Sequence, residues 1–158
     1  MKKIIRFSWA NPLIWAALCA FLFSFSVRPG AHSFQVYLDS KLIIDQYVNS
    51  KMEAPKLWLD PAENYSQLIV KYNECGRTVT GRKIAMKDDN DKILKEWRFE
   101  GAASGYKESM TCKVKDIIAL KQKGSNALRL FYSSNEFREG QEIAHVFIGS
   151  QPKTALNK

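Results

Sequence analysis

From residue 32 onward the chain consists of short runs in which apolar and polar residues alternate, each ended by a turn-forming stretch. Alternation with a period of two places the apolar side chains on one face of a β-strand. An amphipathic helix would instead need apolar residues three and four positions apart over several turns. The pattern therefore predicts an all-β domain built from short antiparallel strands.

About eight such runs are present, and two pairs of them predict hairpins. The first pair is 34–38 and 42–48; the second is 82–86 and 93–99, joined by the polar turn KDDNDK. The other expected strands lie at 55–61, 66–75, the start of 110–120, 127–133 and 143–149. Outside the N-terminal segment, the best helix candidate is 116–123, and Gly124 limits it to about two turns.

We expect these strands to form an antiparallel β-sandwich of the immunoglobulin-like or jelly-roll-like kind, because many short strands at this spacing are typical of that class. A barrel is the alternative, since the pattern does not determine closure. The chain lacks the cysteine–tryptophan–cysteine spacing of true immunoglobulin domains. The expected domain covers 32–150, and a flexible tail covers 151–158.

Residues 1–31 predict an export segment. Basic residues at positions 2, 3 and 6 precede a run without charged side chains from 8 to 27, which is the layout of a signal peptide. The run is also long enough to cross a membrane as a helix, so an uncleaved anchor over 8–27 is the alternative.

Cleavage is favoured over anchoring, because Asn11 and Pro12 shorten the fully apolar part of the run. Small-residue sites suited to a signal peptidase follow at 24–26 and 31–33. Cys19 does not suggest a lipid-modified cysteine, since the bulky Leu18 precedes it. In either case we expect the domain to be periplasmic or extracellular.

Much of the net charge belongs to the export segment. Four of the 24 basic residues and none of the 16 acidic ones lie in 1–31, so the exported part carries 20 − 16 = +4. Charges of both signs alternate along the domain, which gives no reason to expect a nucleic-acid partner. Contact with a membrane is expected only through an uncleaved N-terminal segment.

Cys75 and Cys112 are the two cysteines left after the export segment. An even number of cysteines in an exported chain favours a disulfide. The predicted bond would close a loop of 112 − 75 = 37 residues and stabilise the domain by about 3–4 kcal/mol. A zinc site is disfavoured, because it needs four ligands and close cysteine pairs. A catalytic thiol would need a base, and nothing in the sequence places His145 beside either sulfur.

Two further polar features have a structural and a functional interpretation. We interpret His145 as a partly exposed strand histidine, since no nucleophile motif accompanies it. The acidic run Asp88-Asp89-Asn90-Asp91 offers oxygen ligands for calcium, but it lacks the spacing of the helical calcium loop. We therefore predict a plain hairpin turn there, and we expect no metal and no cofactor. The sequon Asn64-Tyr65-Ser66 is a glycosylation site only in a host that modifies exported proteins.

Trp58 and Trp97 are the candidate binding aromatics, because each lies opposite or beside the main apolar face of its strand. Core packing is the competing interpretation, as it is for the tyrosines of the strands. The resulting hypothesis is an exported, non-catalytic domain with a binding or structural role in the cell envelope, whose partner is an envelope protein or a glycan. The alternatives are a ligand-binding or inhibitory module, and a small hydrolase that uses scattered carboxylates such as Asp60, Glu63 and Glu74.

Overall fold

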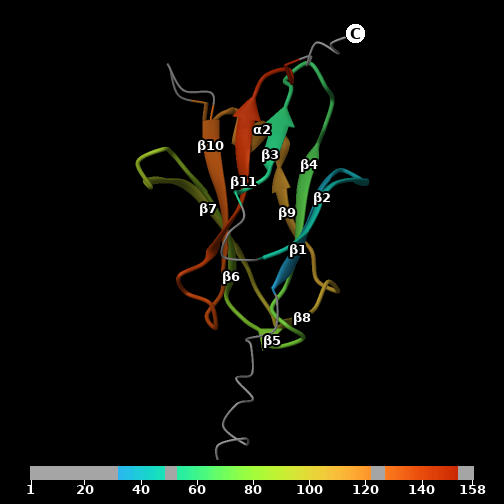
Figure 1. The fold of residues 1–158 in the computed structure, drawn as a ribbon, viewed down its shortest axis with the longest axis vertical. Helices are drawn as coiled ribbons and strands as arrows, with labels where there is room; N and C mark the ends of the chain where they lie inside the picture. The colour runs from blue at the N-terminus through green and yellow to red at the C-terminus, as the bar shows by residue number, and fades with distance from the viewer. Residues whose placement is uncertain (1–31, 49–52, 122–126, 153–158) are drawn as a thin grey trace, which may run out of the picture.

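The computed structural model describes residues 32–48, 53–121 and 127–152. Strands are the main secondary structure of these residues and only one short helix is described, which confirms the predicted all-β class (Figure 1). The elements are β1 (Ser33–Leu38), β2 (Lys41–Tyr47), β3 (Lys56–Leu59), β4 (Gln67–Asn73), β5 (Thr78–Val79), β6 (Arg82–Lys87), β7 (Ile93–Phe99), β8 (Ala103–Ser104), β9 (Met110–Lys113), α2 (Val114–Ile118), β10 (Ala127–Ser133) and β11 (Gln141–Ile148).

The strands form two main sheets and one small one. The first sheet has the order β2-β1-β4-β9, the second has the order β3-β11-β10-β6-β7, and β5 pairs with β8. All ladders are antiparallel except the one between β3 and β11, which is parallel. This pair corrects the expectation of uniformly antiparallel strands. The strand β3 is short and lies between Pro55 and Pro61, and prolines of this kind are tolerated at sheet edges.

Both predicted hairpins are present. The strands β1 and β2 pair around a turn at Asp39, whose φ of +52° is a left-handed conformation that aspartate tolerates. The strands β6 and β7 pair around the polar turn, where Asp91 has a φ of +61°. Each ladder contains one register shift, which is the signature of a β-bulge.

The helix α2 has five residues and follows β9 directly. It begins two residues before the predicted candidate at 116–123 and ends earlier. Val114 and Ile117 are its buried side chains. Because so short a helix is not stable alone, it is packing of these side chains against the core that keeps it folded.

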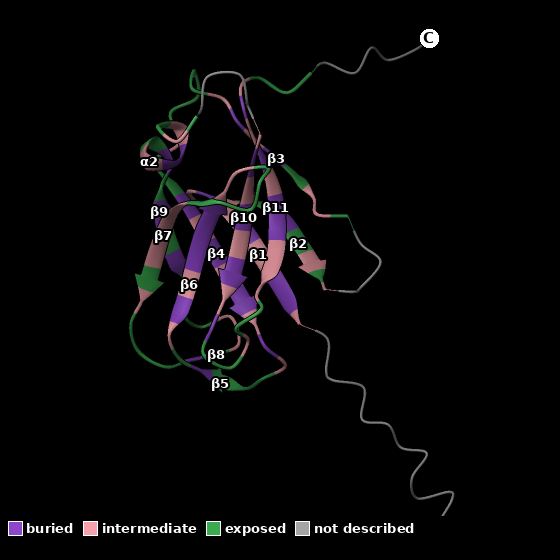
Figure 2. Cartoon of the chain, turned by 90° about the vertical axis from the view of Figure 1, so that its left-hand side faces the viewer, coloured by how far each residue is buried: buried purple, intermediate pink, exposed green. Residues whose placement is uncertain are grey.

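The two main sheets pack face to face around one hydrophobic core. The predicted apolar face of β1, formed by Phe34, Val36 and Leu38, lies entirely within it. Figure 2 shows buried segments along strands of both main sheets. Tyr72 of β4 and Tyr132 of β10 stack across the interface with ring centroids 3.9 Å apart, which is a direct contact between the two layers.

The predicted export segment with Cys19, and the tail from residue 153 onward, lie outside the described residues. In the described part of the chain, no helix is both long and apolar enough to cross a membrane.

Candidate functional site

A groove of about 440 Å³ lies between β2 and β3, which are edge strands of different sheets. Its walls include Lys41 and Ile43 from β2 and Lys56 and Trp58 from β3. The loop that follows β3 adds acidic and aromatic side chains to the lining. The groove therefore brings together residues that are distant in the sequence and belong to both sheets.

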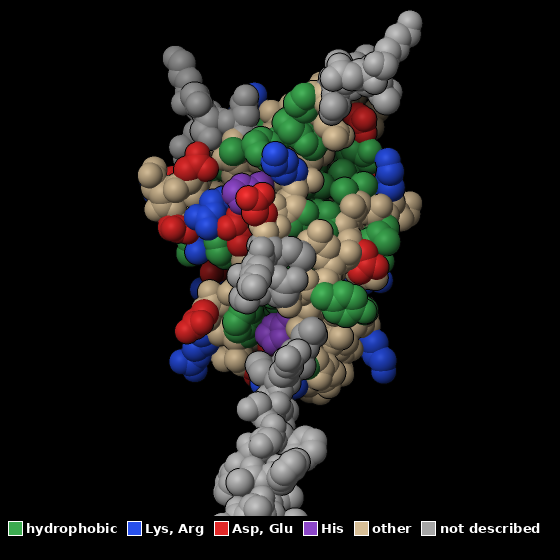
Figure 3. Space-filling view, viewed as in Figure 1, with side chains coloured by type: hydrophobic (Ala, Val, Ile, Leu, Met, Phe, Trp, Pro, Cys, Tyr) green, Lys and Arg blue, Asp and Glu red, His purple; other side chains and the backbone are tan. Residues whose placement is uncertain are grey.

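Trp58 is the fixed aromatic wall of this groove. Its ring stacks on that of Phe147 of β11, with centroids 4.7 Å apart and an angle of 22° between the planes. Because β11 borders β3 on only one side, the other face of the indole is directed toward the open edge, where the groove lies. Figure 3 shows hydrophobic side chains gathered near the top of this side of the molecule, above a cluster of charged side chains and a histidine.

Asp60 and Glu63 bring two carboxylates to the groove. Asp60 accepts hydrogen bonds from the hydroxyl of Ser150 at 2.5 Å and from the backbone N–H of Ala62 at 2.9 Å. These bonds, that of Ser150 first, lower the pKa of Asp60 below its ordinary value, so this carboxylate is ionised at neutral pH. A hydrogen bond between Tyr65 and Glu63 raises the pKa of Tyr65, so the tyrosine stays protonated and orients Glu63.

Lys41 and Lys56 bring two ammonium groups to the groove. Both residues are exposed. The ion pairs of the described residues involve other lysines and arginines. The groove thus carries two positive and two negative side chains, and its formal charge is zero.

Glu74, the third carboxylate of the hydrolase hypothesis, lies elsewhere. It follows β4, has an exposed fraction of 3% and accepts hydrogen bonds from Tyr132 and Ser134 at 2.8 and 2.7 Å. Burial, followed by this hydrogen bond to Glu74, raises the pKa of Tyr132 above its ordinary value. The fold therefore brings Asp60 and Glu63 together but leaves Glu74 in a buried network between the sheets.

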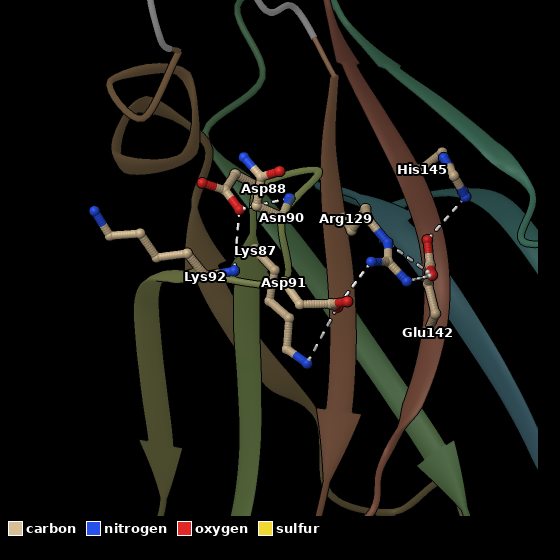
Figure 4. Close-up of polar contacts among 8 residues, drawn as sticks. All are labelled: Lys87, Asp88, Asn90, Asp91, Lys92, Arg129, Glu142 and His145. Atoms are coloured by element: carbon tan, nitrogen blue, oxygen red, sulfur yellow. Dashed lines mark hydrogen bonds and ion pairs between the residues drawn. The ribbon is translucent and has the colours of Figure 1, made fainter.

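A second polar cluster covers the outer face of the second sheet (Figure 4). Arg129 of β10 donates from Nε and Nη2 to Oε2 of Glu142 at 3.0 and 2.6 Å, and these bonds contribute most to raising its pKa. Its Nη1 donates to Asp91 at 2.8 Å. Nε2 of His145 lies 2.9 Å from Oε1 of Glu142, which makes an ion pair when the imidazole is protonated. His145 is thus a half-exposed strand histidine, as predicted.

The acidic run forms a hairpin turn, as predicted. Oδ1 of Asp88 accepts hydrogen bonds from the backbone N–H groups of Asn90 and Lys92 at 2.9 and 3.0 Å, and Figure 4 shows both. Asp91 contacts Arg129 and lies 3.9 Å from Nζ of Lys87. Across the described residues, no three His, Cys, Asp or Glu side chains are grouped so that they could hold a metal ion.

The predicted bond between Cys75 and Cys112 is not formed. Cys112 lies opposite Leu68 in the ladder between β9 and β4, whereas Cys75 lies beyond the other end of β4. From Leu68 to Asn73, the last residue of β4, the strand advances by 73 − 68 = 5 residues, or roughly 17 Å, and Cys75 lies two residues beyond that end. A disulfide needs Cα atoms within about 7 Å, so the register of the sheet excludes the pairing. Burial of Cys112 raises the pKa of its thiol to about 12, which keeps it neutral.

Of the two candidate tryptophans, only Trp58 lines the groove. Trp97 lies on β7 opposite Ile84 and packs against the hydrophobic core, so core packing explains it. Asn64 is exposed in the loop after β3; its modification stays a prediction.

Sequence reasoning missed Lys56, Lys41 and the bond from Ser150 to Asp60. A signal for part of the site was present, because Lys56, Trp58 and Asp60 alternate along KLWLD and therefore share a face. No sequence pattern indicated that β2 and Ser150 would lie beside this face.

No protein-family model matches the chain, and no curated protein matches its sequence.

Proposed function

We propose that the protein is an exported, non-catalytic binding domain of the cell envelope, with a β-sandwich of the immunoglobulin-like or jelly-roll-like kind. Its ligand occupies the groove between β2 and β3. The observation that carries this proposal is the position of Trp58, whose indole is held by Phe147 with one face toward an open groove. Rigid aromatic side chains offer large contact area at a low entropic cost, which is why they dominate binding surfaces.

The distribution of exposed apolar side chains supports a binding role for β2, the strand that forms one wall of the groove. Among the described residues, four large hydrophobic side chains are exposed, and three of them belong to the edge strand β2: Leu42 at 45%, Ile43 at 36% and Tyr47 at 71%. The fourth is Ile93 on β7. An edge strand with an exposed apolar surface is a site of association unless it is covered.

The alternative of a hydrolase receives less support. A glycosidase needs one carboxylic acid that stays protonated at working pH, so its pKa is raised. Asp60 has the opposite environment, since Ser150 and Ala62 lower its pKa. Glu74 lies outside the groove, where its side chain accepts hydrogen bonds from Tyr132 and Ser134.

Export is part of the proposal, and the fold favours one of the two candidate cleavage sites. Ser33 is the first residue of β1, has an exposed fraction of 3%, and pairs with Tyr47 and Asn73 on its two sides. Cleavage after Ser33 would remove it from the sheet, whereas cleavage after Ser26 leaves β1 complete. We expect N-terminal sequencing of protein from the envelope fraction to begin at Val27. An intact Met1 on soluble cytoplasmic protein would refute both the proposed export and the proposed role in the envelope.

Site-specific photocrosslinking in living cells tests the groove itself. A benzoyl-phenylalanine at position 43 should give a crosslinked adduct in the envelope fraction, and Trp58→Ala in the same chain should abolish it. The matched control carries the same photoreactive group in place of Ile93, an exposed isoleucine on the edge strand of the other sheet. Adducts of equal yield at both positions, or none at position 43, would refute binding in the groove.

A further inference from the structure

We infer that the ligand of the groove is a neutral saccharide with a pyranose-type ring; this inference rests on the binding role proposed above. A sugar ring has an apolar C–H face and a rim of hydroxyl groups that both donate and accept hydrogen bonds. A site that matches it needs a flat aromatic surface with donors and acceptors around its edge. The groove combines these two features.

The flat surface is the free face of Trp58. The stack on Phe147 holds the indole in one orientation, so the surface exists before the ligand arrives. Tyr65 adds a second aromatic ring to the lining, and its hydroxyl is oriented by Glu63. A preorganised site avoids the entropic cost of ordering side chains on binding.

The acceptors are Asp60 and Glu63. Each oxygen of Asp60 receives one hydrogen bond from the protein, Oδ1 from Ala62 and Oδ2 from Ser150. A carboxylate has about four acceptor positions, so both oxygens keep capacity for ligand hydroxyl groups. Because the two protein bonds hold the carboxylate in place, it is suited to accept from two neighbouring hydroxyl groups at once.

The donors are Lys41 and Lys56, which approach the groove from opposite walls. Together with the two carboxylates they give the groove no net formal charge. A strongly anionic ligand would be attracted by the two lysines and repelled by the two carboxylates, and a strongly cationic ligand would meet the reverse. A neutral polyhydroxylated ring uses all four groups as hydrogen-bond partners, which favours it over a charged ligand.

An extended peptide is the principal competing occupant, since it could add to the free edge of β2. Strand addition depends on backbone bonds and on the apolar side chains of β2, and it does not require the carboxylates beyond β3. Substitution of Trp58 or Asp60 should therefore weaken the binding of a saccharide, whereas substitution of Leu42 should weaken the binding of a peptide.

The test uses the protein in the form recovered from the cells that express it. Binding is measured against an array of neutral, amino and uronic tetrasaccharides, with sorbitol as a polyol without a ring face, and against a random decapeptide library. Calorimetry on the best ligand then compares Trp58→Ala, Asp60→Ala and Leu42→Lys with the control Tyr47→Ala, an exposed aromatic on β2 outside the groove. Trp58→Leu, which retains an apolar contact with Phe147, replaces Trp58→Ala if urea unfolding shows that the latter does not fold.

We expect saturable binding of at least one neutral tetrasaccharide and none of sorbitol. Trp58→Ala and Asp60→Ala should each weaken the affinity for this tetrasaccharide about tenfold or more. Tyr47→Ala and Leu42→Lys should keep an affinity within about twofold of that of the unchanged protein. Selective binding of decapeptides that Leu42→Lys abolishes would overturn the saccharide inference and leave the binding role intact. Preference for uronic over neutral sugars would also overturn it. If neither array nor library binds, while the crosslinking experiment is negative as well, the proposed function itself fails.

Discussion

Removing the hydroxyl group of Tyr132 should destabilise the fold, because it leaves the buried carboxylate of Glu74 short of a donor. The carboxylate is 3% exposed, and its Oε1 accepts from Tyr132 at 2.8 Å and from Ser134 at 2.7 Å. A hydrogen bond to a charged group contributes about 1.5–3 kcal/mol, and a buried acceptor cannot replace the lost bond with one to water. The stack of ring 132 on Tyr72 survives in Tyr132→Phe, so the change isolates the hydroxyl group.

We therefore expect Tyr132→Phe to lower the free energy of unfolding by about 2 kcal/mol. For a domain of this size that is roughly 6–12 °C in Tm. Urea unfolding followed by tryptophan fluorescence measures the change, and the slope with denaturant should stay constant if only stability has changed. The matched control is Tyr47→Phe, since Tyr47 is 71% exposed; it should change stability by less than about 0.5 kcal/mol.

Ser134→Ala gives an internal check, because its hydroxyl donates to the same oxygen. The two donors share one acceptor, so the double variant should depart from additivity by about 0.5 kcal/mol or more. If Tyr132→Phe and Tyr47→Phe had the same free energy of unfolding, the hydrogen bond from Tyr132 to Glu74 would contribute nothing to stability. The reasoning above would then be refuted.

Three further outcomes follow from the fold. Mass analysis of non-reduced protein should find no peptide that joins Cys75 to Cys112, and native Cys112 should resist alkylation that proceeds in urea; a joined peptide would contradict the register of β4 and β9. Because the folded pKa of Cys112 is raised to about 12, its contribution to stability is complete below about pH 9 and is lost as pH rises toward 12. Urea titrations from pH 8 to 11 should show a decline that Cys112→Val reduces, and an unchanged slope in that variant would exclude the thiol as its cause. Gly140→Ala should lower the free energy of unfolding by about 1–3 kcal/mol more than Gly76→Ala does. Both glycines have a φ of +70°, but only at Gly140 would the added Cβ lie 2.6 Å from the carbonyl oxygen of Tyr132. Equal losses of stability in thermal unfolding would show that this clash has no effect.

The groove could be predicted from the sequence only in part. The alternation in KLWLD places Lys56, Trp58 and Asp60 on one face, and the same period marked Trp58 as a candidate binding residue. What the pattern did not indicate is that this face borders β2. That neighbour depends on the order of strands in two different sheets, which is a non-local property.

The disulfide failed as a prediction for the same reason. The expected compartment and the even number of cysteines are general arguments for a disulfide. They say nothing about the distance between Cys75 and Cys112 in the fold. The register between Leu68 and Cys112 decides that distance. Likewise, the hydrolase hypothesis grouped Asp60, Glu63 and Glu74 by residue type, and the structure places Glu74 in the core.

The sequence by itself determined the local features of this protein: where the longer strands lie, which face of each is apolar, and where the two hairpin turns occur. These follow from side-chain alternation and turn chemistry, which act between residues close in the chain. The tertiary structure alone decided the parallel pairing of β3, the separation of the cysteines, the burial of Glu74 and the meeting of Lys41 with Trp58 across the groove. Each of these depends on which strands become neighbours when two sheets bury one common core, and a pattern of period two is compatible with many such arrangements.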